Sequence, residues 1–128
     1  MFKKLTPNFM VEDVDKAIEF YRDILGFQVV HTVPGEGITN FAILHEGGVE
    51  IMLQAKKSLL EDVKSVGEQD ISASIICYLD VDGIQALYDR ICDKVDVIEP
   101  MRKTFYGMNE FYIRDPYGYV LGFAERIK

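Results

Sequence analysis

The chain has 128 residues, of which 48% are hydrophobic and 27% charged, a composition typical of one soluble globular domain. The net charge of −7 argues against nucleic acids and anionic membrane surfaces as partners, because both attract clustered Lys and Arg. No apolar run approaches the roughly 18 residues of a transmembrane helix. The N-terminus carries no signal-like apolar stretch, so we expect a cytoplasmic protein. Cys77 and Cys92 belong to no Cys-x-x-Cys motif and are predicted to be buried free thiols.

The two halves of the chain repeat each other at an offset of 70 residues. The clearest matches are Phe9–Val11 with Leu79–Val81, Phe41–Ile43 with Phe111–Ile113, and Ile51–Leu53 with Leu121–Phe123. Polarity and turn positions agree along the whole repeat, which indicates a duplicated structural unit. We therefore expect a single domain, residues 1–128, made of two repeats at about 1–57 and 71–128 and joined by a linker at 58–70.

The first repeat predicts a strand, a helix and three further strands. Alternation predicts a strand over Leu5–Val11, and Asp13 then caps a helix that runs to about Leu25 before Gly26 ends it. The remaining strands are predicted over Phe27–Val33, Thr39–Leu44 and Val49–Gln54. In the linker, Ser58 followed by Glu61 would cap a short helix.

The second repeat predicts the same order of elements. The expected segments are a strand over Ser72–Val81, a helix over Gly83–Lys94, a strand over Val95–Glu99 and a hairpin turning at Asp115–Gly118. The segment Met101–Met108 is rich in aromatic residues and Met and would be a loop that closes over a cleft. The fold class is therefore α+β, with two βαβββ modules forming a curved mixed sheet around that cleft.

Two segments resemble a known family. Pro7–Phe27 reads PNFMVEDVDKAIEFYRDILGF, and Phe111–Tyr119 reads FYIRDPYGY. They resemble the opening and the closing hairpin of the vicinal oxygen chelate superfamily, which includes glyoxalase I, extradiol dioxygenases, fosfomycin resistance enzymes and bleomycin resistance proteins. The resemblance covers nearly the whole chain and implies the paired-module fold, but this fold hosts many chemistries.

The resemblance also implies four positions at which the enzymes of the superfamily hold a divalent metal. In this sequence those positions are Thr6, Met52, Ile76 and Gly122. Two of these side chains offer no donor atom, a Met thioether is too soft, and a Thr hydroxyl is a poor neutral donor. We expect His31 and His45 to be solvated surface residues. The sequence therefore predicts no metal site of the inherited kind and no cofactor.

Strand alternation from those four positions predicts the residues that line the cleft. The predicted ligand-binding residues are Asn8, Met10, Met52, Gln54, Ile76, Tyr78, Glu110 and Tyr112. The same count pairs Tyr112 with Gly122, Glu110 with Ala124, Ala42 with Met52 and Asn40 with Gln54. Apolar walls with a few polar groups are typical of a small-molecule pocket, and aromatic plus acidic side chains suit planar cationic ligands.

The acidic residues of the cleft leave two interpretations open. Glu110 and Asp80 could form a carboxylate pair for acid–base chemistry. Alternatively, they form a partly solvated rim, or they pair with Arg102 or Arg114. No Ser/His/Asp triad, Cys/His pair or phosphate-binding Gly-rich loop is present, so no catalytic residue is assigned.

Three functions follow from these features. The first is a metal-independent protein that binds and sequesters a small molecule, as the resemblance to the homodimeric bleomycin resistance proteins implies. The second is a metal-dependent lyase, isomerase or dioxygenase whose displaced ligands include Glu50, Glu110 and a histidine. The third is a structural or partner-binding module. A tightly bound metal would favour the second, and the absence of a cavity would favour the third.

Overall fold

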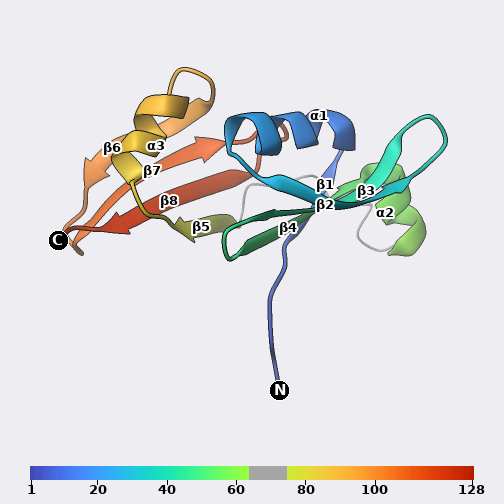
Figure 1. The fold of residues 1–128 in the computed structure, drawn as a ribbon, viewed down its shortest axis with the longest axis horizontal. Coiled ribbons are helices and arrows are strands. Elements are labelled where there is room, and N and C mark those ends of the chain that lie inside the picture. Colours follow the sequence, from blue (N-terminus) through green and yellow to red (C-terminus); the bar gives the residue numbers. More distant parts are fainter. Residues whose placement is uncertain (64–74) are drawn as a thin grey trace. The chain divides into compact units, whose positions relative to one another are not determined.

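The computed structural model describes residues 1–63 and 75–128, and the chain divides into two compact units, Met1–Asp70 and Ile71–Lys128 (Figure 1). The strands form two mixed four-stranded sheets with the orders β1-β4-β3-β2 and β5-β8-β7-β6. The predicted α+β fold of two modules is confirmed, with one sheet in each repeat where the sequence had suggested a shared sheet. Among the described residues, no helix combines the length and the apolar character that crossing a membrane takes.

The first unit follows the predicted order of elements. Its elements are β1 (Asn8–Val11), α1 (Val14–Glu19), the π-helix η1 (Phe20–Ile24), β2 (Gln28–Pro34), β3 (Thr39–Glu46), β4 (Val49–Ala55) and α2 (Lys56–Asp62). The short linker helix is present as α2, but it begins after Ala55 and has no side-chain cap, so the proposed Ser58 cap is wrong. β1 begins at Asn8 and not at Leu5, where the sequence pattern had placed it.

The first helix begins as predicted and changes its winding midway. The Asp13 carboxylate accepts a hydrogen bond of 3.1 Å from the Lys16 N–H, which caps α1. In η1 the Leu25 N–H bonds to the Phe20 carbonyl five residues back, and this wider turn brings both adjacent side chains Phe20 and Tyr21 into the core. Gly26 follows with a φ of 84°, the left-handed conformation that ends helices.

The core of the first unit lies between α1 with η1 and the sheet. Tyr21 is 1% exposed and packs its ring against Phe9, Phe20 and Phe27. Alternate residues of the central strands, including Ala42 and Leu53, are fully buried on the face toward these helices. We call the opposite face of this sheet, which α1 and η1 do not cover, its open face, and we use the same name for the corresponding face of the second sheet.

The second unit contains β5 (Ile76–Asp80), α3 (Ile84–Ile91), β6 (Asp96–Lys103), β7 (Met108–Arg114) and β8 (Val120–Arg126). The predicted strand start at Ser72 lies outside the described residues. The loop predicted over Met101–Met108 is shorter in the structure: β6 continues to Lys103 and pairs Arg102 with Glu110, and only residues 104–107 form the turn before β7. Pro100, which lacks a donor, falls within a register shift of this edge strand, so the ladder resumes after it.

A carboxylate from the last strand caps α3. Gly83 precedes the helix and has no side chain that could accept the free N–H groups. Glu125 of β8 accepts hydrogen bonds from the Gly83 N–H at 2.9 Å and the Ile84 N–H at 3.1 Å. Below α3, Phe111 is fully buried, stacks on Phe123 and meets the edge of Tyr88.

The two repeats differ by one residue in their last hairpin turn. Gly47 and Gly48 form the turn between Glu46 and Val49, whereas three residues separate Asp115 from Tyr119 in the second repeat. The predicted pairs of Tyr112 with Gly122 and of Glu110 with Ala124 are confirmed. The pairs in the first repeat are wrong: Met52 lies opposite Ile43, not Ala42, and Gln54 lies opposite Phe41, not Asn40. A slip of one residue reverses the face of a strand, so Ala42 points into the core.

Both cysteines are free thiols, as predicted, but each is half-buried and not fully buried. Burial, followed by the charge of Asp115, raises the pKa of the Cys77 thiol. Cys77 is therefore a weak nucleophile at neutral pH.

Candidate functional site

The predicted ligand-binding residues lie on the open faces of the two sheets, four in each unit. In the first unit Asn8 pairs with Met52 and Met10 pairs with Gln54 across β1 and β4. In the second unit the same arrangement places Ile76, Tyr78, Glu110 and Tyr112 on one face of β5, β8 and β7. Asn8, Ile76 and Tyr78 are exposed, Met52 and Tyr112 are half-buried, and Met10, Gln54 and Glu110 are buried.

A buried carboxylate organises the open face of the second unit. Glu110 is fully buried, yet its side chain accepts four hydrogen bonds. Its donors are Tyr78 at 2.8 Å, Tyr106 at 2.5 Å, Arg102 at 3.2 Å and Tyr112 at 3.4 Å. A carboxylate offers about four acceptor positions, so this one is saturated. Sequence reasoning missed Tyr106, which lies in the turn between β6 and β7.

The hydrogen bonds decide the charge of this carboxylate. Desolvation alone would raise the pKa of Glu110, but the hydrogen bonds from Tyr106, Tyr78 and Arg102 outweigh it and lower the pKa. Tyr78 keeps its proton as well, because partial desolvation of its phenol group and the hydrogen bond to Glu110 both raise the pKa of that phenol to about 12. At neutral pH the cluster is thus an ionised carboxylate held by protonated tyrosines.

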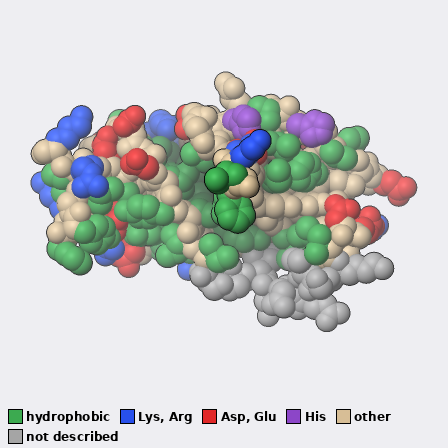
Figure 2. Space-filling view, turned by 90° about the horizontal axis from the view of Figure 1, so that it is seen from below, with side chains coloured by type: hydrophobic (Ala, Val, Ile, Leu, Met, Phe, Trp, Pro, Cys, Tyr) green, Lys and Arg blue, Asp and Glu red, His purple; other side chains and the backbone are tan. Residues whose placement is uncertain are grey.

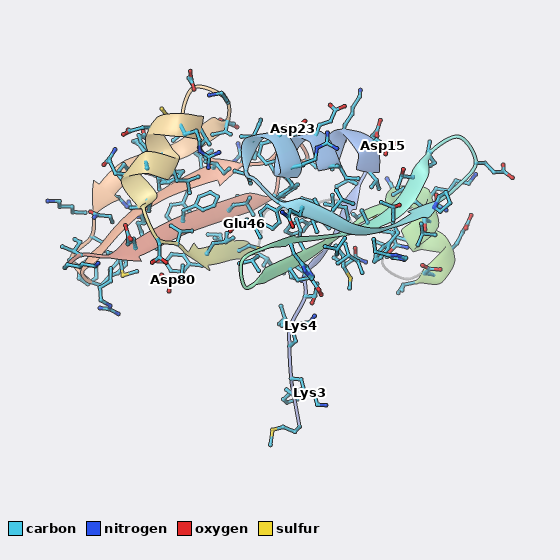
Figure 3. All side chains as sticks on the ribbon, viewed as in Figure 1. Lys3, Lys4, Asp15, Asp23, Glu46 and Asp80 are labelled. Atoms are coloured by element: carbon cyan, nitrogen blue, oxygen red, sulfur yellow. The ribbon has the colours of Figure 1, made fainter. Side chains whose placement is uncertain are left out.

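This arrangement decides between the two interpretations of Glu110. Arg102 approaches the carboxylate at 3.2 Å, so the predicted pairing with Arg102 is confirmed. Glu110 is buried, so the alternative of a partly solvated rim is wrong for this residue. Asp80 is exposed at the end of β5 (Figure 3), and Arg114 lies next to Asp96 instead. The acid–base pair of Glu110 with Asp80 therefore has no support in the geometry.

Gly122 makes room for an aromatic ring. A Cβ atom placed on Gly122 would lie 2.6 Å from Cε2 of Tyr112, so this ring lies directly against the glycine backbone. The Arg102 guanidinium also stands over this ring, 6.0 Å from its centroid. Tyr112 therefore contacts both the backbone of the sheet and a cation.

The open face of the first unit is partly covered by its own chain. The Gln54 amide accepts a hydrogen bond from Asn8 and donates to Ser58 and Asp62 of α2. These bonds fix α2 to the end of β4 on the open face, and they leave Gln54 only 5% exposed. Met10, which pairs with Gln54, is likewise buried. Both residues are therefore shielded from solvent.

A second polar cluster surrounds Glu50 on the same face. Glu50 lies opposite His45 in the β3–β4 hairpin, and the two side chains approach to 2.5 Å. Thr6 donates to the same carboxylate at 2.8 Å, and Lys4 lies 3.0 Å from it. Figure 3 shows Lys4 on the extended segment before β1. The histidines are exposed at the surface, as predicted (Figure 2), but His45 is engaged by Glu50.

This cluster predicts a specific pH dependence. The bonds from His45, Lys4 and Thr6 lower the pKa of Glu50 to about 2, against an ordinary value of 4.5. A lowered folded-state pKa gives stability that is present above about pH 4.5 and is lost as the pH falls toward 2. We expect Glu50→Gln to unfold at lower urea concentration than the wild type near neutral pH, with the difference shrinking below about pH 4.5. A difference that stays constant between about pH 6 and pH 3 would contradict this assignment.

The residues at the implied metal positions do not fit a divalent cation. Thr6 already donates its hydroxyl to Glu50, and the Tyr112 ring occupies the space in which a side chain at Gly122 would stand. Ile76 has no donor atom, and the Met52 thioether is too soft for the usual metals of such sites. Within residues 1–63 and 75–128, no three His, Cys, Asp or Glu side chains gather as a metal site.

The first unit also contains a cavity of about 490 Å³ that sequence reasoning missed. It lies between α2 and the β2–β3 turn. Its lining residues are Pro34, Gly35, Glu36, Ile38, Asn40, Lys57, Ser58 and Glu61. None of the predicted ligand-binding residues lines it. Sequence analysis missed this cavity because the mixed polar sequence of the turn and of α2 shows no pattern typical of a pocket.

The structure is thus a paired-module α+β fold in which the side chains at the implied metal positions do not form a donor set. The chain belongs to the Glyoxalase/Bleomycin resistance protein/Dioxygenase superfamily, whose family model matches residues 5–123. This confirms the resemblance found in the sequence.

One relative is similar in sequence, and two solved structures are similar in fold. The bleomycin resistance protein of Geobacillus stearothermophilus is 30% identical over 132 residues, which span 95% of this chain and 96% of the relative. A protein of unknown function from Agrobacterium tumefaciens has a similar crystal structure, with a TM-score of 0.82, 21% identity and coverage of 99% of this chain and 96% of that one. The bleomycin-binding protein of Streptomyces verticillus, crystallised with copper(II)-bleomycin, aligns with a TM-score of 0.65, 20% identity and coverage of 96% and 95%. The chain is thus a distant homologue of bleomycin resistance proteins.

Proposed function

We propose that this protein binds and sequesters a small molecule without a metal of its own. The observation that carries the proposal is the full-length similarity to a bleomycin resistance protein, at 30% identity. The metal positions of the superfamily support it, since their side chains here do not form a donor set. As in the sequence-based expectation, we propose a cytoplasmic homodimer.

The open faces favour an aromatic or cationic ligand. Five of the predicted site residues are accessible and are proposed as ligand contacts: Asn8, Met52, Ile76, Tyr78 and Tyr112. Met10, Gln54 and Glu110 are proposed to hold those contacts in place. The net charge of −7 attracts cations to the protein, and aromatic side chains offer flat surfaces on which a planar ring can stack.

Bleomycin is the first ligand to test, because the curated relative is named for resistance to it. Metal-free bleomycin and copper(II)-bleomycin would each be titrated into the protein by calorimetry, with the change in melting temperature as a second readout. A ligand at about 100 times its Kd adds roughly 2.7 kcal/mol to the free energy of unfolding, which a thermal melt detects readily. Calorimetric saturation at one site per subunit is expected. If neither form binds, and a set of aromatic cations also leaves the melt unchanged, the proposal is wrong.

The metal-dependent alternative keeps one observation in its favour, which is the close approach of His45 and Glu50 at 2.5 Å. Elemental analysis of protein purified without chelator distinguishes it from the binding proposal. Near-stoichiometric zinc, nickel, manganese or iron that is lost in Glu50→Gln would favour the enzyme. Traces below about a tenth of an equivalent, unchanged after incubation with these metals, would favour sequestration.

A further inference from the structure

The duplication has produced two open faces of unequal chemistry. In the first unit, α2 covers the face around Gln54, and every polar atom of that amide is engaged by Asn8, Ser58 or Asp62. In the second unit, the residue at the same place in the repeat is Ala124, and the neighbouring face presents aromatic rings. Tyr78 is 50% exposed and Tyr106 is 48% exposed. Exposed rings of this size in one patch are typical of binding surfaces.

The hydroxyl groups of these rings are turned away from a ligand. Tyr78 and Tyr106 donate to the same buried carboxylate, at 2.8 and 2.5 Å, so their protons are already used. What each of these half-exposed side chains offers to a ligand is therefore its aromatic ring. A phenol that donates to a carboxylate gains electron density in the ring, which strengthens the attraction of the ring face for a positive charge.

The unit already contains one contact of this kind. The Arg102 guanidinium stands 6.0 Å from the centre of the Tyr112 ring, and its NH2 group donates to Glu110. A planar cation and a ring whose hydroxyl reaches Glu110 are therefore compatible in this cluster. Glu99 lies 4.0 Å from the same guanidinium, so the charges of Glu110, Arg102 and Glu99 add up to one negative charge. A neutral or anionic ligand would gain nothing from that charge.

We propose that the π-faces of Tyr78 and Tyr106 bind a planar organic cation, and that Glu110 is the positioning residue that orients both rings. The proposal rests on the proposed function and narrows it to one unit and one ligand class. Glu110 itself is fully buried and acts on the ligand only through the two tyrosines. Affinity for a cation over a neutral ring of the same shape is the signature of this arrangement.

The probes are a matched pair, N-methylacridinium, which is always cationic, and acridine, which is neutral at mildly alkaline pH. Binding is followed by fluorescence on the full chain at low salt. We expect the wild type to bind the cation about three- to tenfold more tightly than acridine, the range for a partly exposed cation–π contact. Glu110→Gln should abolish this preference, and Tyr78→Leu should weaken the binding of both dyes.

Glu50→Gln is the matched control, because it removes one negative charge from a similarly engaged carboxylate in the other unit. It should keep the cation preference of the wild type. If Glu110→Gln and Glu50→Gln reduce the preference equally, the effect is one of net charge and the positioning role is wrong. Tyr78→Phe, which keeps the ring and loses only the hydroxyl, covers the case in which Glu110→Gln does not fold, and it should also reduce the preference.

Failure of this inference and failure of the proposed function have different results. A wild type that saturates with bleomycin but binds both dyes equally, or neither, overturns the inference and leaves the proposed function in place. A wild type that binds neither bleomycin nor any aromatic cation overturns both. Loss of the cation preference in Glu110→Gln and Tyr78→Phe alone, with both proteins folded, supports the inference.

Discussion

Replacing Phe111 with alanine is expected to lower the free energy of unfolding by about 3–5 kcal/mol. Phe111 is fully buried in the core. Its ring stacks on Phe123 at a centroid distance of 5.0 Å and meets the edge of Tyr88 at 4.9 Å. Its removal loses the transfer free energy of the ring and leaves a cavity between α3 and the sheet. Urea unfolding of the wild type and the variant, compared at an unchanged m-value, measures the difference.

Phe105→Ala is the matched control for this prediction. It is the same substitution in the same unit, but the Phe105 side chain is 99% exposed. Its effect on stability should stay within about 0.5 kcal/mol. Equal losses in the two variants would mean that Phe111 does not lie in the core, and the alternation that puts Glu110 and Tyr112 on the open face would be wrong with it.

Gly122→Ala is expected to cost about 1–3 kcal/mol, the usual range for an added methyl group in a packed site. The new Cβ would lie 2.6 and 2.9 Å from two carbons of the Tyr112 ring, so the ring must move away from the sheet. The movement would also draw the Tyr112 hydroxyl from Glu110 and the ring from Arg102. Thermal or urea unfolding measures the cost.

A double-mutant cycle shows whether this cost comes from the contact with Tyr112. In the background of Tyr112→Ala the ring is absent, and Gly122→Ala should then be neutral or stabilising by up to about 1 kcal/mol, because alanine restricts the unfolded chain. If Gly122→Ala costs the same in both backgrounds, the ring does not lie on the glycine. The pairing of β7 with β8 would then need a different register.

Local signals in the sequence predicted the elements well. Asp13 caps the first helix, and Gly26 adopts the left-handed conformation that ends it, as their residue types suggest. Asp115–Gly118 form the expected turn. These features depend on a few neighbouring residues, so a single sequence contains them. The one-residue difference between the two hairpin turns does not appear in such a pattern, because the flanking strands match at either offset. The wrong pairing of Ala42 follows from it.

The candidate site was predicted as far as strand alternation reaches. Alternation brought Tyr78, Glu110 and Tyr112 to one face, where the structure joins them by hydrogen bonds. It could not include Tyr106, because this residue lies in a turn, where side-chain direction has no period. Alternation also could not predict that α2 covers Gln54, because this depends on how a helix formed mostly by the linker packs against the sheet.

The cap of α3 gives the two repeats different routes to their native structure. α1 is capped by Asp13, one residue before its start, so that helix can nucleate from local chain alone. α3 receives its cap from Glu125, more than forty residues later in the chain. During synthesis α1 can thus form as soon as its own residues have left the ribosome, whereas the cap of α3 is completed only after β8 has followed. Both sheets close across a similar length of chain, because β1 waits for β4 and β5 waits for β8, so the two modules differ in when the helix is fixed.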